Sequence, residues 1–162
     1  MVTDLVMYEE EFDRIQQLLN RLRVDASAKI VFLVDKNGQQ IAGAGEIDQV
    51  DTTSLASLTA GNVAATDGLA KLIGEKEFSI LFHEGRKDNI HISIVGQRLI
   101  LVVIFDERSS LGLVRLRVRK ASADIERILG DMEAKAQQLG SAEIASPFAE
   151  ITDDDIDALF SE

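Results

Sequence analysis

Cysteine is absent from this chain of 162 residues, and only one proline and two histidines occur. Without cysteine the protein can form no disulfide, no thiolate metal site and no thiol nucleophile. The length suits one domain of ordinary size, whose hydrophobic core needs no covalent cross-link. The composition therefore predicts a domain that is held together by packing alone.

Long hydrophobic runs are also missing. The longest strongly apolar run, Leu99 to Phe105, is far too short to span a bilayer. The amino end, MVTDLVMYEEEF, carries acids where a signal peptide has a basic region and an uninterrupted apolar stretch. We therefore predict a soluble, cytoplasmic protein with no membrane insertion.

Positive charge is scarce, because 17 Lys and Arg stand against 28 Asp and Glu, for a formal net charge of −11. Nucleic acids and anionic membranes both reward a basic surface, so this balance argues against either as a partner. Seven of the acids follow Gly140, where no Lys or Arg occurs. The opposite tendency is a basic cluster, either a solvated face or a docking site, formed by Arg115, Arg117, Arg119 and Lys120.

Hydrophobic periodicity predicts one helix, two strands, a second helix, three strands and a third helix. Asn37-Gly38 suits a tight turn between the first two strands. Short connections make successive strands antiparallel, so the predicted fold class is α+β, with helices on a five-stranded sheet and the fully apolar strand in its centre. The predicted elements are 8–24, 30–34, 39–44, 53–73, 78–83, 90–95, 99–105, and a helix from Ser109 or Ser110 through Met132. A flexible linker is predicted over Gly140–Pro147, which divides the chain into a domain at 1–139 and a tail at 140–162.

Patterns for catalysis, metal ions and cofactors are lacking. His83 and His91 fall on different predicted strands, without the spacing of a ligand pair, and we predict that both face solvent. No phosphate-binding loop or dinucleotide fingerprint occurs. Asp35, Asp88 and Asp106 lie at strand ends, where turn chemistry explains them better than acid–base catalysis. We therefore predict that the chain is not an enzyme and holds no metal and no cofactor.

The helix predicted over 53–73 has two unlike faces. At 100° per residue, one face is large and apolar, as expected of a helix on a core, and gathers Leu55, Leu58, Leu69, Leu72 and Ile73 with Asn62 and Ala65. The opposite face, here called the small-residue stripe, consists of Ser57, Gly61, Ala64, Gly68 and Lys71. Small residues on a solvent-facing stripe add no packing interactions, and each glycine in a helix interior lowers helix stability by about 1 kcal/mol. Something is therefore expected to approach this stripe closely, either a partner or a neighbouring helix of the same protein.

The order of elements, with the segments VFLVDKNGQ and DTTSLASLTAGNVAATDGLAKLIGE, resembles the Roadblock family, whose domain is profilin-like. The resemblance continues through FHEG, LILVVIFDERSSLGLVRLRV and the terminal SPFAEITDDDIDALFSE, so it covers essentially the whole chain. It implies a homodimer that binds the GTP form of a small Ras-like GTPase of the MglA type and stimulates its GTP hydrolysis. The setting it implies is a bacterium in which that GTPase controls cell polarity or gliding motility, with the protein concentrated at a cell pole. The GTPase would dock on the second helix, where the matching small positions are Ala60, Gly61, Ala64, Ala65 and Gly68.

An activator of this kind either inserts a cation beside the γ-phosphate or places the catalytic groups of the GTPase itself. Lys71 is the one cation of the small-residue stripe, while Arg86, Arg98 and Arg108 belong to predicted turns or loops. The resemblance implies the second route, in which the switch region of the GTPase is reshaped. Two other classes stay open: a scaffold that binds a GTPase without accelerating hydrolysis, and a small-molecule sensor, which the densely apolar strands disfavour.

The acidic tail has an ordered apolar spacing, because one helical edge would gather Ile151, Ile156, Leu159 and Phe160. Thr152 and the three acids after it suit the start of a helix. Alone such a helix is too short to be stable. We expect it to fold onto a partner, the same GTPase at a second site; the alternative is a solubilising tail.

The predicted strand 78–83 lies at the edge of the sheet and has no proline or lysine to block pairing. Pairing of two such edges, with Phe78, Ile80 and Phe82 at the dimer interface, would bring the two second helices side by side about a two-fold axis. A GTPase lying across that axis would exclude a second one. The expected complex has two copies of this chain and one GTPase.

Overall fold

The computed structural model describes residues 7–148, with side chains through residue 139, and its elements follow the predicted order. Their bounds are α1 (Glu9–Asp25), β1 (Ile30–Asp35), β2 (Gln40–Gly45), the short 3₁₀ helix η1 (Ile47–Gln49), α2 (Thr52–Leu72), β3 (Ile80–Glu84), β4 (Asn89–Val95), β5 (Leu99–Phe105) and α3 (Leu111–Phe148).

The five strands form one antiparallel sheet in the order β2-β1-β5-β4-β3. Every residue of β5 is buried, which confirms the central position predicted from its unbroken apolar sequence. β3 is an edge strand, as predicted. The turn between β1 and β2 contains Gly38 at φ +91°, a conformation that residues with a Cβ rarely adopt, so the predicted Asn-Gly turn is also confirmed.

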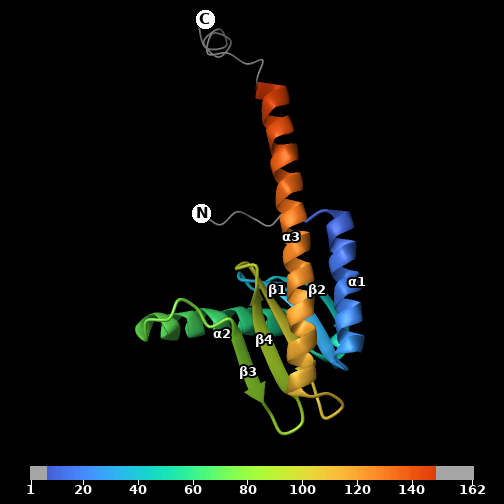
Figure 1. Ribbon diagram of the computed structural model, residues 1–162, viewed down its shortest axis with the longest axis vertical. Helices are drawn as coiled ribbons and strands as arrows, with labels where there is room; N and C mark the ends of the chain where they lie inside the picture. Colours follow the sequence, from blue (N-terminus) through green and yellow to red (C-terminus); the bar gives the residue numbers. More distant parts are fainter. Residues whose placement is uncertain (1–6, 149–162) are drawn as a thin grey trace, which may run out of the picture.

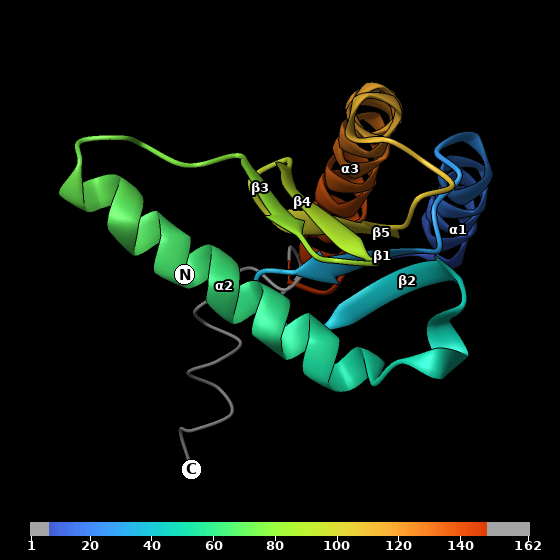
Figure 2. The ribbon, with the colours of Figure 1, turned by 90° about the horizontal axis from the view of Figure 1, so that it is seen from below.

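Helices cover both faces of the sheet (Figures 1 and 2). α1 and α3 lie antiparallel on one face, and α2 crosses the other. Because side chains alternate along a strand, β1 and β5 feed two separate hydrophobic clusters. The cluster under α1 and α3 includes Val31, Leu33, Leu101, Val103 and Phe105 from the strands and Ile15, Leu19, Val114, Val118 and Ile125 from the helices. The cluster under α2 includes Ile30, Phe32, Val34, Ile92, Ile100 and Val102, with Ala56 and Val63 from the helix.

The orientation predicted for α2 is wrong. The buried residues of this helix are Ala56, Thr59, Val63 and Ala70. Four of the residues expected to face the core are exposed instead, namely Leu58, Leu69, Leu72 and Ile73. The face of the sheet below already carries large Ile, Phe and Val side chains, so the helix approaches it with small ones. In addition, the carboxy-terminal part of α2 extends past the edge of the sheet at β3 (Figure 2).

α3 is longer than predicted. It spans 38 residues to Phe148, so the linker expected over Gly140–Pro147 is helical in the structure (Figure 1). A single Gly140 costs only about 1 kcal/mol in a helix, and the Ala and Glu residues that follow it favour helix. The division of the chain into a domain and a tail at residue 140 stays a prediction.

His91 does not face solvent, contrary to prediction, because its side chain is only 1% exposed. In β4 it pairs with Phe82 of β3 and Val103 of β5, on the face that α3 covers. Neither ring nitrogen meets a hydrogen-bond partner within the described part of the chain. This burial lowers the pKa of the imidazole, and the positive charge of Arg115 lowers it further. His83, on the edge strand, is exposed as predicted.

Candidate functional site: the outer face of helix α2

Helix α2 begins with a well-formed cap. Asp51 is the N-cap residue, and its carboxylate accepts a hydrogen bond from the backbone N–H of Ser54 at 3.2 Å and another from the Ser54 hydroxyl at 2.7 Å. These hydrogen bonds to Ser54 lower the pKa of the Asp51 carboxyl. Asp51 thus satisfies the backbone N–H of Ser54 in the first turn, as an N-cap residue does.

The inner face of α2 carries small or medium-sized side chains, namely Ala56, Thr59, Val63 and Ala70. Thr59 and Thr66 satisfy their hydroxyls within the helix, by donating to the carbonyls of Leu55 at 2.7 Å and Asn62 at 2.8 Å. The β1–β2 turn also approaches this helix, since a Cβ on Gly38 would lie 3.3 Å from Cα of Ser57. The small residues predicted that something lies close to this helix. Near Ser57, that neighbour is the β1–β2 turn of the same chain.

The rest of the small-residue stripe is open. Nothing lies within 4 Å of a Cβ built on Gly61 or Gly68. Six of the seven residues proposed to contact a GTPase are exposed, namely Ser57, Gly61, Ala64, Ala65, Gly68 and Lys71. The seventh, Ala60, is half-buried and packs against the cluster under α2. Along Ser57, Gly61, Ala64 and Gly68, the stripe thus presents a shallow surface without bulky side chains.

A second exposed band, here called the leucine stripe, runs beside the small residues and consists of Leu58, Leu69, Leu72 and Ile73. Leu58 is 73% exposed, Leu69 59% and Leu72 83%. Single exposed leucines are common, but several at helical spacing on one helix mark an interaction surface. Sequence reasoning assigned these residues to the core. The signal that would have corrected it is the second helical period, Ala56, Ala60, Val63 and Ala70, which fits a face against a sheet of large residues.

The edge strand β3 adjoins this surface. The Asn62 side-chain amide lies 2.9 Å from Nε2 of His83, which joins α2 to β3. Of the three residues predicted for a dimer edge, Ile80 is 50% exposed, whereas Phe82 is partly buried against the core and stacks on Phe105 with ring centroids 6.2 Å apart. Phe78 lies before β3, in its connection with α2, because the strand begins two residues later than predicted.

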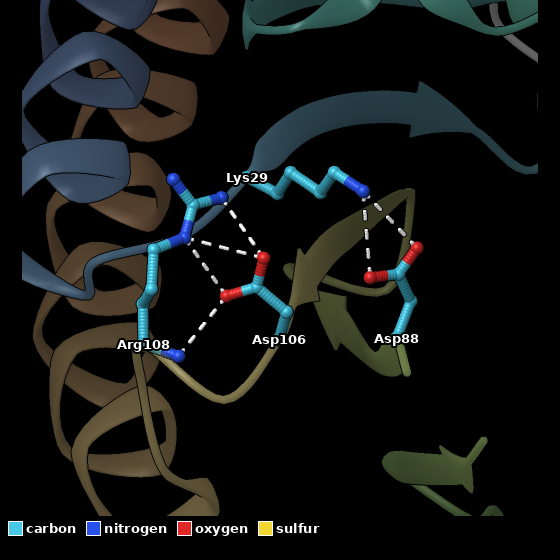
Figure 3. A network of polar contacts seen from close by, with 4 residues as sticks. All are labelled: Lys29, Asp88, Asp106 and Arg108. Atoms are coloured by element: carbon cyan, nitrogen blue, oxygen red, sulfur yellow. Dashed lines mark hydrogen bonds and ion pairs between the residues drawn. The ribbon is translucent and has the colours of Figure 1, made fainter. Parts of the chain in front are cut away.

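Charge is nearly absent from the outer face of α2, where Lys71 is the one cation of the helix. Arg108 is engaged elsewhere: its guanidinium donates to both carboxylate oxygens of Asp106, with two contacts of 2.9 Å (Figure 3). These hydrogen bonds lower the pKa of the Asp106 carboxyl to about 2. Lys29 pairs in the same region with Asp88 at 3.2 Å (Figure 3). The Asp106 carboxylate also accepts from the backbone N–H of Arg108 at 3.0 Å, which is the turn role predicted for it. Asp88 instead acts through its ion pair with Lys29.

Asp35 likewise caps its turn by accepting from the backbone N–H groups of Asn37 and Gln39. Within the described residues, no group of three or more His, Asp or Glu side chains could hold a metal ion. No helix in that part of the chain is long and apolar enough to cross a membrane. The tail residues proposed as a second GTPase contact, Ile151, Ile156, Leu159 and Phe160, lie outside the described residues.

Known proteins resemble this chain in sequence and in fold. Residues 14–105 match the Roadblock/LC7 domain. The solved structure of MglB from Myxococcus xanthus is 63% identical, covers 79% of this chain and 96% of its own, and superposes with a TM-score of 0.75. The gliding protein MglB from Thermus thermophilus is 31% identical, covers 81% of this chain and 99% of its own, and gives a TM-score of 0.73. A solved MglB described as having a tetrameric arrangement is 30% identical over 82% of this chain and 99% of its own, with a TM-score of 0.74.

More distant structures share the fold alone. Profilin IA of Acanthamoeba castellanii is 11% identical, covers 68% of this chain and 95% of its own, and gives a TM-score of 0.53. No curated protein matches the chain. The predicted profilin-like fold is thus confirmed. By the domain match and the identity to the solved MglB structures, the chain belongs to the Roadblock/LC7 family and within it resembles MglB.

Proposed function

We propose that this chain is a homodimeric regulator that binds the GTP form of a small Ras-like GTPase of the MglA type and stimulates its GTP hydrolysis. The observation that carries the proposal is the outer face of α2, where open glycines and exposed leucines lie side by side. The resemblance to MglB supports the choice of partner. In the bacterium, this activity would control cell polarity or gliding motility.

The two stripes of α2 have different tasks in this proposal. The leucine stripe, with the edge of β3, pairs two protomers, because large aliphatic side chains gain most from burial against each other. Ile80 is exposed on that edge strand and would join the same interface. The tetrameric arrangement in the description of one MglB relative supports self-association. The small-residue stripe receives the GTPase, because Gly61 and Gly68 let another backbone approach within contact distance.

Stimulation follows from positioning rather than from an inserted cation. An arginine finger stabilises the charge that develops on the transferred phosphoryl group. The outer face of α2 offers only Lys71, and Arg108 is held by Asp106. A flat helix face instead acts on the switch region of the GTPase and brings the partner's own catalytic groups into place. The chain itself contributes no group to the chemical step, so it is a non-catalytic activator.

The proposed complex contains two copies of this chain and one GTPase. Pairing through the leucine stripe brings the small-residue stripes of both protomers to the two-fold axis. A GTPase across that axis contacts both helices and covers the equivalent site. Light scattering at saturation should therefore return a 2:1 complex, and one GTPase per protomer would exclude the shared surface.

An arginine in the stripe tests the site. Gly68→Arg places a long charged side chain where nothing lies within 4 Å, so the fold should persist while binding to the GTPase loaded with a non-hydrolysable GTP analogue is lost. Gly112→Arg on α3 is the matched control, because this glycine is equally open and lies on a different helix. Affinity should fall only for Gly68→Arg. Equal affinities for the two variants would refute the site, and loss of the dimer in Gly68→Arg would assign the stripe to self-association. If the unmodified protein binds the GTPase but does not accelerate its GTP hydrolysis, the protein is a scaffold.

A further inference from the structure

A basic groove lies between α1 and α3. These two helices cover the face of the sheet opposite α2 (Figure 2). Its volume is about 350 Å³, and its apolar lining comes from both helices: Leu18, Leu22, Ala121 and Ile128. Five cations surround this apolar lining, namely Arg14, Arg21, Arg117, Lys120 and Arg127. The lining contains only two acids, Asp25 and Asp124. This groove is a concentrated positive surface on a chain whose net charge is −11.

Among the described residues, two of these cations form ion pairs with acids and three do not. Arg14 pairs with Asp131 at 3.0 Å, and Arg127 pairs with Asp124 at 3.3 Å. Within the part of the chain that the structure describes, no ion pair engages Arg21, Arg117 or Lys120. Nε of Arg117 is buried there and meets no hydrogen-bond acceptor. Guanidinium and ammonium groups form strong, charge-assisted hydrogen bonds with carboxylates, so a carboxylate placed in the groove would be bound favourably.

The basic cluster seen in the sequence is divided by the fold. Arg117 and Lys120 line the groove, whereas Arg119 lies on the opposite side of α3 at helical spacing. Arg117 and Lys120 can therefore form a docking site, which was the alternative to a solvated face. An occupant of the groove should combine carboxylates for the rim with aliphatic side chains for the floor.

Residues 149–162 of this chain have that composition. They contain six acids and no Lys or Arg, namely Glu150, Asp153, Asp154, Asp155, Asp157 and Glu162. Their apolar residues, Ile151, Ile156, Leu159 and Phe160, recur at helical spacing among the acids. Both the charge and the apolar pattern of the tail complement the groove.

Chain length keeps the three consecutive aspartates of this tail away from the basic groove of their own chain. From Phe148 back to Lys120, α3 spans about 42 Å at 1.5 Å per residue. From Phe148 forward to Asp157, a fully extended chain reaches at most about 32 Å. The consecutive residues Asp153, Asp154 and Asp155 reach at most about 25 Å beyond Phe148. They therefore cannot pair with Lys120 or Arg117 of the same chain, and their carboxylates fit the groove of another copy.

We propose that the groove between α1 and α3 binds the acidic tail of a second copy of this chain. The carboxylates of Asp153–Asp157 pair with Arg21, Arg117 and Lys120, and the aliphatic side chains pack against Leu18 and the alkyl stems of these cations. A tail held in this way cannot contact a GTPase at the same time. The groove thus binds the tail as long as no GTPase is bound.

The absence of cysteine allows a direct test with the full chain. Gln17→Cys is placed in one chain, at an exposed position of the groove, and Ser161→Cys in a second chain of different mass. After mixing and mild oxidation, the mixed disulfide should form at several times the yield obtained with Glu126→Cys in place of Gln17→Cys. Glu126 is the matched control, because it is exposed on the opposite side of α3. The yield should drop at 1 M salt, where the Debye length is about 3 Å.

Charge reversal identifies the contacts. Arg21→Glu with Lys120→Glu in the groove chain should reduce the yield to that of the control, and Arg119→Glu should leave it unchanged; circular dichroism checks that each variant folds. Equal yields for Gln17→Cys and Glu126→Cys would overturn the proposal. Binding of a polyglutamate peptide to the groove without tail cross-linking would also overturn it, and would assign the groove to a foreign acidic partner.

Discussion

Truncation of one leucine separates the two roles proposed for α2. Leu69 is 59% exposed in the protomer, so Leu69→Ala should change the stability of an isolated protomer by no more than about 0.5 kcal/mol. In a symmetric dimer, the same side chain is buried twice. A fully buried leucine contributes about 1.5–3 kcal/mol, so the exposed fraction of Leu69 contributes about 1–2 kcal/mol per copy and about 2–4 kcal/mol per dimer. The dimer dissociation constant should rise about 30-fold to about 700-fold.

Sedimentation equilibrium over a series of concentrations measures that constant. Leu101→Ala is the matched control, because Leu101 is fully buried in β5 and its truncation should lower the free energy of unfolding by about 2–5 kcal/mol. Leu69→Ala should therefore weaken the dimer and leave the protomer stable, whereas Leu101→Ala should lower the stability of the protomer. An unchanged dissociation constant for Leu69→Ala would refute the assignment of the leucine stripe to the dimer.

Three further predictions concern the fold. The hydrogen bonds from Arg108 lower the pKa of Asp106 from 3.8 to about 2, so their stabilising effect is complete above about pH 4 and is lost as the pH falls toward 2. The urea midpoint should consequently fall more steeply between pH 5 and pH 2 in the unmodified protein than in Asp106→Asn, and parallel curves would contradict this role. Burial lowers the pKa of His91 below 6.5, so the unfolded state takes up the proton first and stability should decline as the pH drops below about 6.5; His91→Leu should flatten the melting temperature between pH 7 and pH 5. Gly38→Ala should lower the free energy of unfolding by about 1–2 kcal/mol in chemical denaturation, because φ is +91° and the new Cβ would lie 3.3 Å from Cα of Ser57, whereas Gly112→Ala should not destabilise.

The strands were predictable because their signals are local. β5 is apolar throughout and is buried throughout, and the Asn37-Gly38 pair sets the turn between β1 and β2. The edge position of β3 followed from its alternating pattern and the short connections. Its start was misplaced by two residues, because Phe78 looks like a strand residue but lies in the connection from α2. The residue pattern identified the strand, but its first paired residue depends on the path of the connection from α2.

The facing of α2 was not predictable from amphipathicity alone. That reasoning assumes that the largest apolar side chains face the core. In this fold the sheet contributes the bulk, through Phe32 and Ile100 among others, and the helix contributes small residues such as Ala56. The leucines then remain exposed on the protomer. The prediction that Gly61 and Gly68 lie on an outer face of the helix is confirmed, since nothing lies within 4 Å of a Cβ built on either. Glycine is unfavourable in a helix interior, so its presence at these two positions was the signal.

The groove between α1 and α3 was only half visible in the sequence. Arg117 and Lys120 stood out as part of a basic cluster, but Arg14 and Arg21 lie about a hundred residues earlier and join them only when α1 packs against α3. Similarly, the buried state of His91 depends on α3 covering β4, which no local pattern reports. Long-range packing therefore determined what local periodicity could not.

Single-turnover GTP hydrolysis by an MglA-type GTPase, measured with and without a saturating amount of this protein, tests the central claim most directly. We expect hydrolysis to be faster with the protein present, to remain faster with Gly112→Arg, and to return to the unassisted rate with Gly68→Arg. An unassisted rate in the presence of the unmodified protein, under conditions where the complex is fully formed, would contradict the account.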